Sequence, residues 1–361
     1  MTFSLTIFCI LLLFAFKGKP YRKAANIFII LISISLVLCS GLRHESIGND
    51  TVNYLNMFED IKLESWKDLT SDFFSKYFSP TNNQDKDPGY SIFIKITQIF
   101  TSNSRAYLFI IAIIFFLSLG KFLKEHTESL QELLFSYVFY INLFNGYVPN
   151  SAIRQTLAIS IILFAYTNLQ KKRCLLFFVY VILASFFHKS ALICLLVLPM
   201  TYLKNIDKLY YLGIPLFLLT LLCVNQFASL FLSNSDIYND YLSGSYYGNS
   251  EKPFVILILM VGLYLIGLLG IISDKNLTNT KLFYVGAFCS LLFSTLVWVN
   301  PTLIRLMTYF APLMGIAIGK AFNRISCGKM IYAVVILIFL ISAFRSIGDY
   351  HFMWEPILLI H

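Results

Sequence analysis

Long apolar runs separated by short polar segments dominate the 361-residue chain. A bilayer-spanning helix needs about 20 apolar residues, with a range of roughly 17–25. This pattern predicts an all-α, polytopic integral membrane bundle of about twelve transmembrane helices, with 10–13 compatible with the soft boundaries of the shorter runs. The twelve runs are 2–16, 24–42, 105–122, 132–148, 152–169, 174–187, 190–203, 209–223, 253–272, 282–299, 303–320 and 330–347.

The same pattern predicts one membrane domain over residues 1–361 with two large polar loops. The loop 43–104 contains a short apolar segment at 90–101, which carries Lys95 and is too short to cross alone, so we expect an interfacial or re-entrant helix. The second loop, 224–252, is rich in Tyr, Ser and Asn. Those side chains suit carbohydrate, and they suit an ordinary aromatic belt at a membrane interface equally well.

Composition supports a membrane protein. Charged residues make up 13% of the chain and the mean hydropathy is +0.72, whereas soluble domains carry roughly 25% charged residues. The net charge of +9 is therefore not evidence for nucleic-acid binding, because basic residues of membrane proteins concentrate in cytoplasmic loops.

The basic residues also predict an orientation. Alternating the spans with residues 17–23 inside places 16 of the 28 Lys and Arg residues, but 5 of the 19 Asp and Glu residues, on the inner side. This positive-inside split requires that 90–101 does not cross. It puts both termini, the 43–104 loop and the 224–252 loop outside.

Cationic and polar side chains gather at the outer ends of the predicted spans: Arg43, Arg154 with Gln155, His188 and Arg305. Ionisable residues are nearly absent from mid-span, where a transport path would display them. The chemistry is therefore expected at the outer surface. A snorkelling arginine at the interface is the structural alternative for each arginine taken singly.

Two of these arginines occupy helix starts. Asn150 is a favourable N-cap before Arg154, and Asn300 with Pro301 is a favourable start before Arg305. Arginine is unfavourable near the positive end of a helix unless an anion compensates it. Free N–H groups and guanidinium donors together suit a diphosphate, so Arg43, Arg154, Arg305 and Gln155 are predicted to bind one.

His188 and Asp50 are the candidate proton acceptors. His188 follows a predicted span, and an unperturbed imidazole titrates near pH 6.5, in the range useful for a general base; a hydrogen-bonded histidine at a helix end is the alternative. Asp50 closes the Gly48-Asn49-Asp50 turn, where helix capping is favoured over a role as base.

Motifs for nucleotide or metal chemistry are missing from the sequence. It has no GxxxxGK[ST] and no HExxH, and the Asp-Lys-Asp of 85–87 falls in the predicted outer loop, where nucleotide sugars are absent.

Five stretches resemble the EpsG/Wzy-type polysaccharide polymerases of bacterial envelopes. They are GLRHESIGNDTVNYLNMF (41–58), DPGY (87–90), NSAIRQTLAISIIL (150–163), SFFHKSALICL (185–195) and RLMTYFAPL (305–313). Their order and spacing agree over nearly the whole chain.

The resemblance implies a lipid-sugar transferase (GT-C-like) membrane fold in the bacterial cytoplasmic membrane, with the active site facing outside. It implies a glycosyltransferase that joins polyprenyl-diphosphate-linked oligosaccharide repeat units into capsular polysaccharide, exopolysaccharide or O-antigen, without metal, nucleotide or other cofactor. It assigns the arginines to Arg43, Arg154 and Arg305, the histidine to His188 and the acid to Asp50. Expected partners are the lipid-linked substrate, the bilayer, a flippase and a chain-length regulator, and no nucleic acid. A lipid-linked oligosaccharide flippase, a polysaccharide ligase and a membrane O-acyltransferase remain alternatives.

Overall fold

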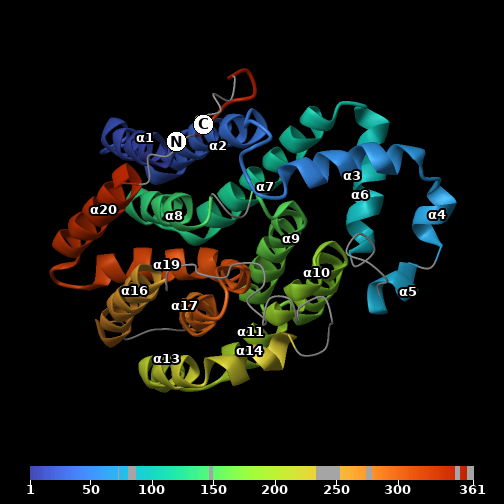
Figure 1. Ribbon diagram of the computed structural model, residues 1–361. Coiled ribbons are helices and arrows are strands. Elements are labelled where there is room, and N and C mark those ends of the chain that lie inside the picture. Colours follow the sequence, from blue (N-terminus) through green and yellow to red (C-terminus); the bar gives the residue numbers. More distant parts are fainter. Residues whose placement is uncertain are drawn as a thin grey trace, which may run out of the picture. The chain divides into compact units, whose positions relative to one another are not determined.

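The computed structural model describes residues 1–71, 73–79, 87–145, 149–232, 253–273, 279–345 and 350–355 (Figure 1). Within these ranges every extended regular element is a helix, and the one β-type contact is an isolated bridge between Arg43 and Phe352. The predicted all-α class is therefore confirmed.

Five of the described helices are long and apolar enough to cross a bilayer. They are α2 (Tyr21–Gly41), α7 (Ser104–His126), α16 (Phe254–Ser273), α17 (Lys281–Ser294) continued by η2 (Thr295–Trp298), and α20 (Gly328–Arg345). A sixth span would join two helical pieces with a bend of 68° between them. The first piece is η3 (Pro301–Leu303) continued by α18 (Ile304–Thr308), and the second is α19 (Ala311–Arg324). The chain is a helical membrane protein.

The other predicted runs do not form helices that are both long and apolar enough to cross a bilayer, so the described helices do not support a count of twelve. Some runs form one helix: α1 (Thr2–Ala15), α8 (Leu130–Leu143), α9 (Ile153–Gln170) and α10 (Cys174–Phe187). The runs 190–203 and 209–223 are broken further, the first into η1 (Lys189–Leu196) and α11 (Val197–Tyr202), the second into α12 (Ile206–Tyr211) and α13 (Gly213–Leu222). Apolar composition predicted these segments, but it does not fix where a helix is interrupted.

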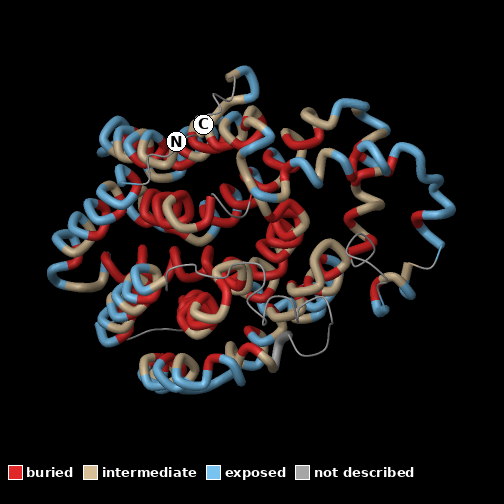
Figure 2. The backbone as a smooth tube through the Cα atoms, viewed as in Figure 1, coloured by how far each residue is buried: buried red, intermediate tan, exposed pale blue. Residues whose placement is uncertain are grey.

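The chain divides into two compact units, one of Met1–Leu192 with Val334–His361 and one of Ile193–Ala333. In the first unit, α9 packs against α7 and α10, α2 packs against α7, and α1 packs against α8. Nearly every residue of α9 is buried or half-buried (Figure 2). This burial makes α9 the central support for the residues at its first turn.

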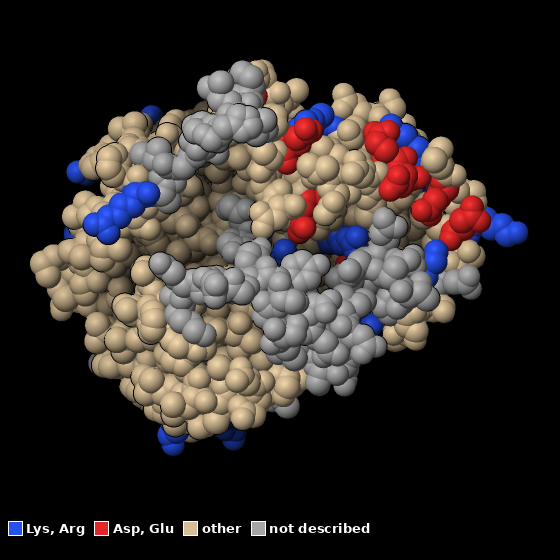
Figure 3. Space-filling view, in the orientation of Figure 1, with Lys and Arg blue, Asp and Glu red and all other residues tan. Residues whose placement is uncertain are grey.

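The predicted outer loop 43–104 is mostly helical. It contains α3 (Thr51–Leu63), α4 (Trp66–Thr70), α5 (Phe73–Phe78) and α6 (Pro88–Phe100), and α6 packs against the other three and against α10. The buried rings of Phe58, Tyr90 and Tyr107 hold α3, α6 and α7 together. Acidic side chains gather over α3 and α4 (Figure 3).

The predicted segment 90–101 corresponds to α6, which has 13 residues. That length is short of a bilayer crossing. One side of α6 is buried through Tyr90 and Ile94, whereas Ile99 and Phe100 are exposed. The interfacial or re-entrant placement of this helix remains a prediction.

In the second unit, α17 packs against α16 and α19. The side chains of Tyr210 and Tyr264 stack, and each hydroxyl donates to the other residue's carbonyl oxygen, which ties α12 to α16. The predicted loop 224–252 begins as helix α14 (Val224–Leu232), and its residues 233–252 lie outside the described part of the chain.

Candidate functional site

Asp87 occupies the N-cap position of α6, directly before Pro88 at the first helical position. An N-cap aspartate ordinarily accepts a hydrogen bond from the N–H groups of its own helix, which stabilises the helix by about 0.5–2 kcal/mol. The Asp87 side chain makes no such bond, although it is only 1% exposed. Its carboxylate is directed to groups on other segments.

The Asp87 carboxylate joins the start of α9 to the end of α10. One oxygen, Oδ2, lies 3.2 Å from Nη1 of Arg154 and 3.5 Å from Nδ1 of His188. The other, Oδ1, accepts a hydrogen bond of 3.3 Å from the backbone N–H of Lys189. We call Asp87, Arg154, His188 and Lys189 the Asp87 cluster.

The side chains of the Asp87 cluster differ in solvent exposure. The Arg154 and His188 side chains are 12% and 13% exposed, so each retains a small accessible edge above the buried carboxylate. Asp87 pairs with the Arg154 guanidinium, whereas Lys189 gives Asp87 only its backbone N–H and makes no ion pair with a described carboxylate. The cluster therefore keeps excess positive charge, which favours an anionic ligand at that edge.

Gly89 brings α6 against the end of α10. A Cβ atom at Gly89 would lie 2.9 Å from both the Cβ and the carbonyl oxygen of Phe186, two residues before His188. The absence of a side chain therefore permits the close approach that puts Asp87 beside His188.

Tyr77 on α5 fixes the same end of α10 from another direction. Its hydroxyl donates to Ser185 Oγ at 2.8 Å, and its carbonyl oxygen accepts from Lys189 Nζ at 3.0 Å. The Lys189 ammonium also lies 5.2 Å from the centre of the Tyr77 ring. The Lys189 ammonium is thus held against α5, a helix other than the two that supply Arg154 and His188.

Aromatic rings flank Arg154. Its guanidinium carbon is 5.2 Å from the centre of the buried Tyr90 ring and 6.0 Å from that of the half-buried Tyr54 ring. Tyr107 donates a 2.5 Å hydrogen bond to the Tyr90 hydroxyl. Cation–π contact and ion pairing together hold the guanidinium in one orientation.

Arg43 lies in the same unit but makes its own set of contacts. It is 1% exposed, its Nη1 donates to the Ser40 carbonyl oxygen, and its Nε lies 3.4 Å from Thr51 Oγ1. Thr51 Oγ1 is also 3.0 Å from the carbonyl oxygen of Asn150, just before α9. Burial lowers the pKa of the Arg43 guanidinium to about 10, so it remains protonated at neutral pH.

The Asn150 contact corrects one local prediction. The N-cap of α9 is Ala152, without a side-chain cap bond, rather than Asn150. Asn150 instead packs its backbone against the turn at Gly48, where a Cβ would lie 1.9 Å from the Asn150 carbonyl oxygen. The expected position of Arg154 is confirmed, because it is the second residue of α9.

Asp50 and Gln155 are the remaining predicted residues of this unit. Asp50 is the N-cap residue of α3, as predicted, but its side chain makes no cap hydrogen bond. Gln155 is 1% exposed and lies on the buried side of α9. The acid that contacts Arg154 and His188 is Asp87, to which the sequence reasoning gave no role.

Arg305 belongs to the second unit. It is the second residue of the short helix α18, which follows the 3₁₀ turn η3 and precedes the 68° bend. The predicted start is confirmed, because Asn300 Oδ1 accepts from the Thr302 N–H at 2.9 Å and Pro301 takes the first position.

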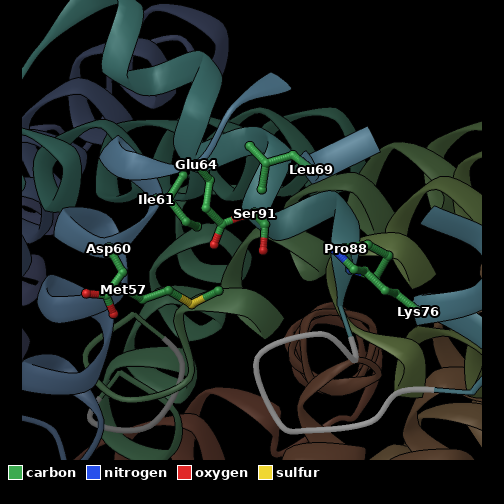
Figure 4. Close-up of a pocket in the computed structure, with 8 residues that line it drawn as sticks. All are labelled: Met57, Asp60, Ile61, Glu64, Leu69, Lys76, Pro88 and Ser91. Atoms are coloured by element: carbon green, nitrogen blue, oxygen red, sulfur yellow. The ribbon is translucent and has the colours of Figure 1, made fainter. Parts of the chain in front are cut away.

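A small cavity of about 40 Å³ lies close to the Asp87 cluster, between α3, α4, α5 and α6 (Figure 4). In this view the oxygen atoms of Glu64 and Ser91 point toward its centre. A space of this size holds a few water molecules at most, so it is not a sugar-binding pocket. It is lined by Met57, Asp60, Ile61, Glu64, Leu69, Lys76, Pro88 and Ser91.

The described residues contain no group of three or more His, Cys, Asp or Glu side chains arranged to hold a metal ion. The Asp87 carboxylate faces the guanidinium of Arg154, the imidazole of His188 and the backbone N–H of Lys189. Such donors suit an anionic or hydroxyl-bearing ligand.

These features define a helical membrane protein with a cationic cluster at the ends of its helices. The model of the EpsG family matches residues 26–357, which is nearly the whole chain. The chain belongs to the EpsG family. Searches of curated proteins and of solved structures find no match.

Proposed function

We propose that this protein is a metal-independent glycosyltransferase that polymerises polyprenyl-diphosphate-linked oligosaccharide repeat units. The product would be a capsular polysaccharide, an exopolysaccharide or an O-antigen. The family membership supports a polysaccharide polymerase-like membrane protein. The identity of the donor and the reaction rest on the chemistry of the site.

The observation that carries the proposal is the placement of Arg154. Its guanidinium lies at the N-terminal turn of α9, next to His188 and with Lys189 in the same cluster. Helix N–H groups and guanidinium donors stabilise the negative charge that develops on a departing diphosphate. A histidine beside them supports removal of the proton from an attacking sugar hydroxyl.

The proposed reaction transfers the growing chain to the next unit. A hydroxyl oxygen of the incoming repeat unit forms a bond to the anomeric carbon of the growing chain. The bond from that carbon to the diphosphate oxygen breaks, and its electron pair leaves with the polyprenyl diphosphate. The hydroxyl proton passes to a base of the protein. No nucleotide, metal or redox partner enters this balance.

Further roles follow from the sequence. Arg43, Arg305 and Gln155 are proposed to contribute to diphosphate binding, and Asp50 to act as an alternative base. The buried position of Gln155 favours an indirect contribution through the start of α9. Each of these roles is tested by substitution.

The setting of the reaction is part of the proposal. We place the protein in the bacterial cytoplasmic membrane, with about twelve crossings in a GT-C-like arrangement and the Asp87 cluster facing outside. The positive-inside split of the basic residues supports this orientation. A flippase would supply the lipid-linked units, and a chain-length regulator is the expected protein partner.

A deletion strain complemented with variants tests the function. Arg154→Ala should abolish long polymer and leave single lipid-linked units on the outer face, while Arg154→Lys should retain part of the activity because the charge stays. Arg173→Ala is the control, since Arg173 is an exposed arginine directly before α10, at the end of that helix opposite His188. Normal polymer from Arg154→Ala would overturn the proposal, and lipid-linked units held inside the deletion strain would indicate a flippase.

A further inference from the structure

Asp87 is a buried N-cap residue whose carboxylate makes no capping hydrogen bond to its own helix. It accepts instead from the backbone N–H of Lys189 and faces Arg154 and His188 with a single oxygen. Departures from local preference of this kind concentrate at functional sites. The sequence order gives no hint of it, because Asp87 and Lys189 are 102 residues apart.

We infer that Asp87 is the positioning residue of this site, which orients His188 as the base and Arg154 as the diphosphate ligand at the same time. The inference rests on the proposed function and names a residue that neither the family match nor the sequence reasoning assigns. Asp87 itself is 1% exposed, so it acts through its two partners rather than on the substrate.

The orientation of His188 follows from the nitrogen that faces the carboxylate. Nδ1 is the ring atom 3.5 Å from Oδ2, and a carboxylate accepts a proton donor there. The neutral imidazole then carries its hydrogen on Nδ1 and its lone pair on Nε2. The 3.5 Å separation is longer than an ordinary hydrogen bond, and the proposed mechanism requires it to shorten in the reactive complex.

His188 contacts Asp87 from the start of α6, and Arg154 from α9 contacts the same carboxylate oxygen. Lys189 follows His188 in the chain and its ammonium contacts Tyr77 on α5, while Tyr90 of α6 contacts the Arg154 guanidinium. Asp87 is the anion among them and offsets the cations beside it. A carboxylate favours the imidazolium, whereas a neighbouring arginine disfavours it. Without Asp87 the imidazole would accept a proton less readily.

The transfer step then has a defined route for its proton. The acceptor hydroxyl oxygen bonds to the anomeric carbon as the carbon–oxygen bond to the diphosphate breaks. The hydroxyl proton moves to Nε2 of His188, and Asp87 stabilises the imidazolium that results. The departing diphosphate takes the electron pair and lies against Arg154. The proton is later released from His188 to solvent or to the diphosphate.

The test uses the purified full-length protein in liposomes with polyprenyl-diphosphate-linked repeat units, with the polymerisation rate measured against pH. Asp87→Asn should lower kcat by about 100-fold or more with little change in KM. It should also move the acidic limb of the pH profile down by about one unit, since the amide no longer favours the imidazolium. Asp60→Asn, which changes an exposed carboxylate on α3, is the matched control and should match the wild type.

Two further variants, His188→Gln and Asp87→Glu, test the inference if Asp87→Asn does not fold. His188→Gln should remove the acidic limb, while Asp87→Glu should keep it at a reduced kcat because the carboxylate is retained but displaced. An unchanged pH profile in His188→Gln, or wild-type kcat in Asp87→Asn, would overturn the inference. Wild-type protein that forms no polymer would instead overturn the proposed function, so the two failures are distinguishable.

Discussion

Asp87 and Arg154 are 67 residues apart in the sequence, yet Asp87 Oδ2 lies 3.2 Å from Nη1 of Arg154. The guanidinium at the start of α9 is therefore compensated by a carboxylate of the protein itself. An arginine at this position was expected to need an external anion. The protein supplies one anion and keeps Lys189 in addition, so the cluster still attracts a second.

The first prediction concerns the stability of the Asp87–Arg154 pair. Arg154→Ala leaves the Asp87 carboxylate buried without its main counter-charge, and such changes cost about 3–5 kcal/mol. The double variant Asp87→Asn with Arg154→Gln should recover part of that loss, because no buried charge remains, and should still make no polymer. Thermal unfolding in detergent measures the first effect and polymer analysis the second. Equal stability of the single and double variants would contradict the pairing.

The second prediction concerns Gly89. Gly89→Ala should lower polymer formation strongly, because the added Cβ would push α6 away from Phe186 and separate Asp87 from His188. Gly262→Ala is the matched control, since a Cβ at Gly262 in α16 meets no atom within 4 Å. It should match the wild type or gain slightly in stability, as alanine is the better helix former. Equal polymer yields from the two variants would argue against the close approach.

The third prediction compares two glycines in the left-handed region. Gly18 and Gly48 have φ angles of +81° and +88°, so alanine is strained at either. That strain costs roughly 1–2 kcal/mol. Gly48→Ala should cost clearly more, because its Cβ would also collide with the backbone of Asn150, whereas Gly18 faces open space. Unfolding temperatures of the two variants provide the comparison, and a larger loss for Gly18→Ala would contradict the contact.

The fourth prediction concerns the cap before Arg305. Asn300→Ala removes the acceptor for the Thr302 N–H and should cost about 0.5–2 kcal/mol. Asn300→Asp keeps an acceptor at this position and should cost less. Polymer yield should fall with Asn300→Ala and fall further with Arg305→Ala, if the start of the bent helix positions that arginine. A fully active Arg305→Ala variant would remove Arg305 from the proposed site.

The sequence predicted the structural features that are determined by residues close together in the chain. The apolar runs indicated helices, Asn300 and Pro301 indicated a helix start, and Arg154 was placed correctly in the first turn of α9. These features are set within a few residues, so periodicity and capping preferences reveal them.

Contacts between segments far apart in the sequence could not be predicted from these local patterns. The carboxylate of Asp87 could only be matched with Arg154 and His188 once α6, α9 and α10 were packed together. Asn150 failed as a cap because its backbone is engaged by the turn at Gly48 and by Thr51, about 100 residues earlier. DPGY (87–90) was noted for the family resemblance alone, and nothing local indicated that the Asp87 carboxylate would contact α9 and the end of α10.

The count of twelve crossings stays a prediction, because five helices of the described residues, or six with the bent pair, are long and apolar enough to cross a bilayer. Composition alone does not register breaks such as the one at Leu212 between α12 and α13 or the bend after Thr308. A helix ends where its packing partners and turn geometry require, and apolar residues on either side of the break look continuous in the sequence.

The most direct measurement is reconstitution of the purified protein in liposomes with polyprenyl-diphosphate-linked repeat units as the only substrate and no nucleotide. The proposed reaction should give polymer of several units, with one polyprenyl diphosphate released for each bond formed, and Arg154→Ala should form no polymer. Movement of intact units across the bilayer without bond formation or release of polyprenyl diphosphate would contradict it.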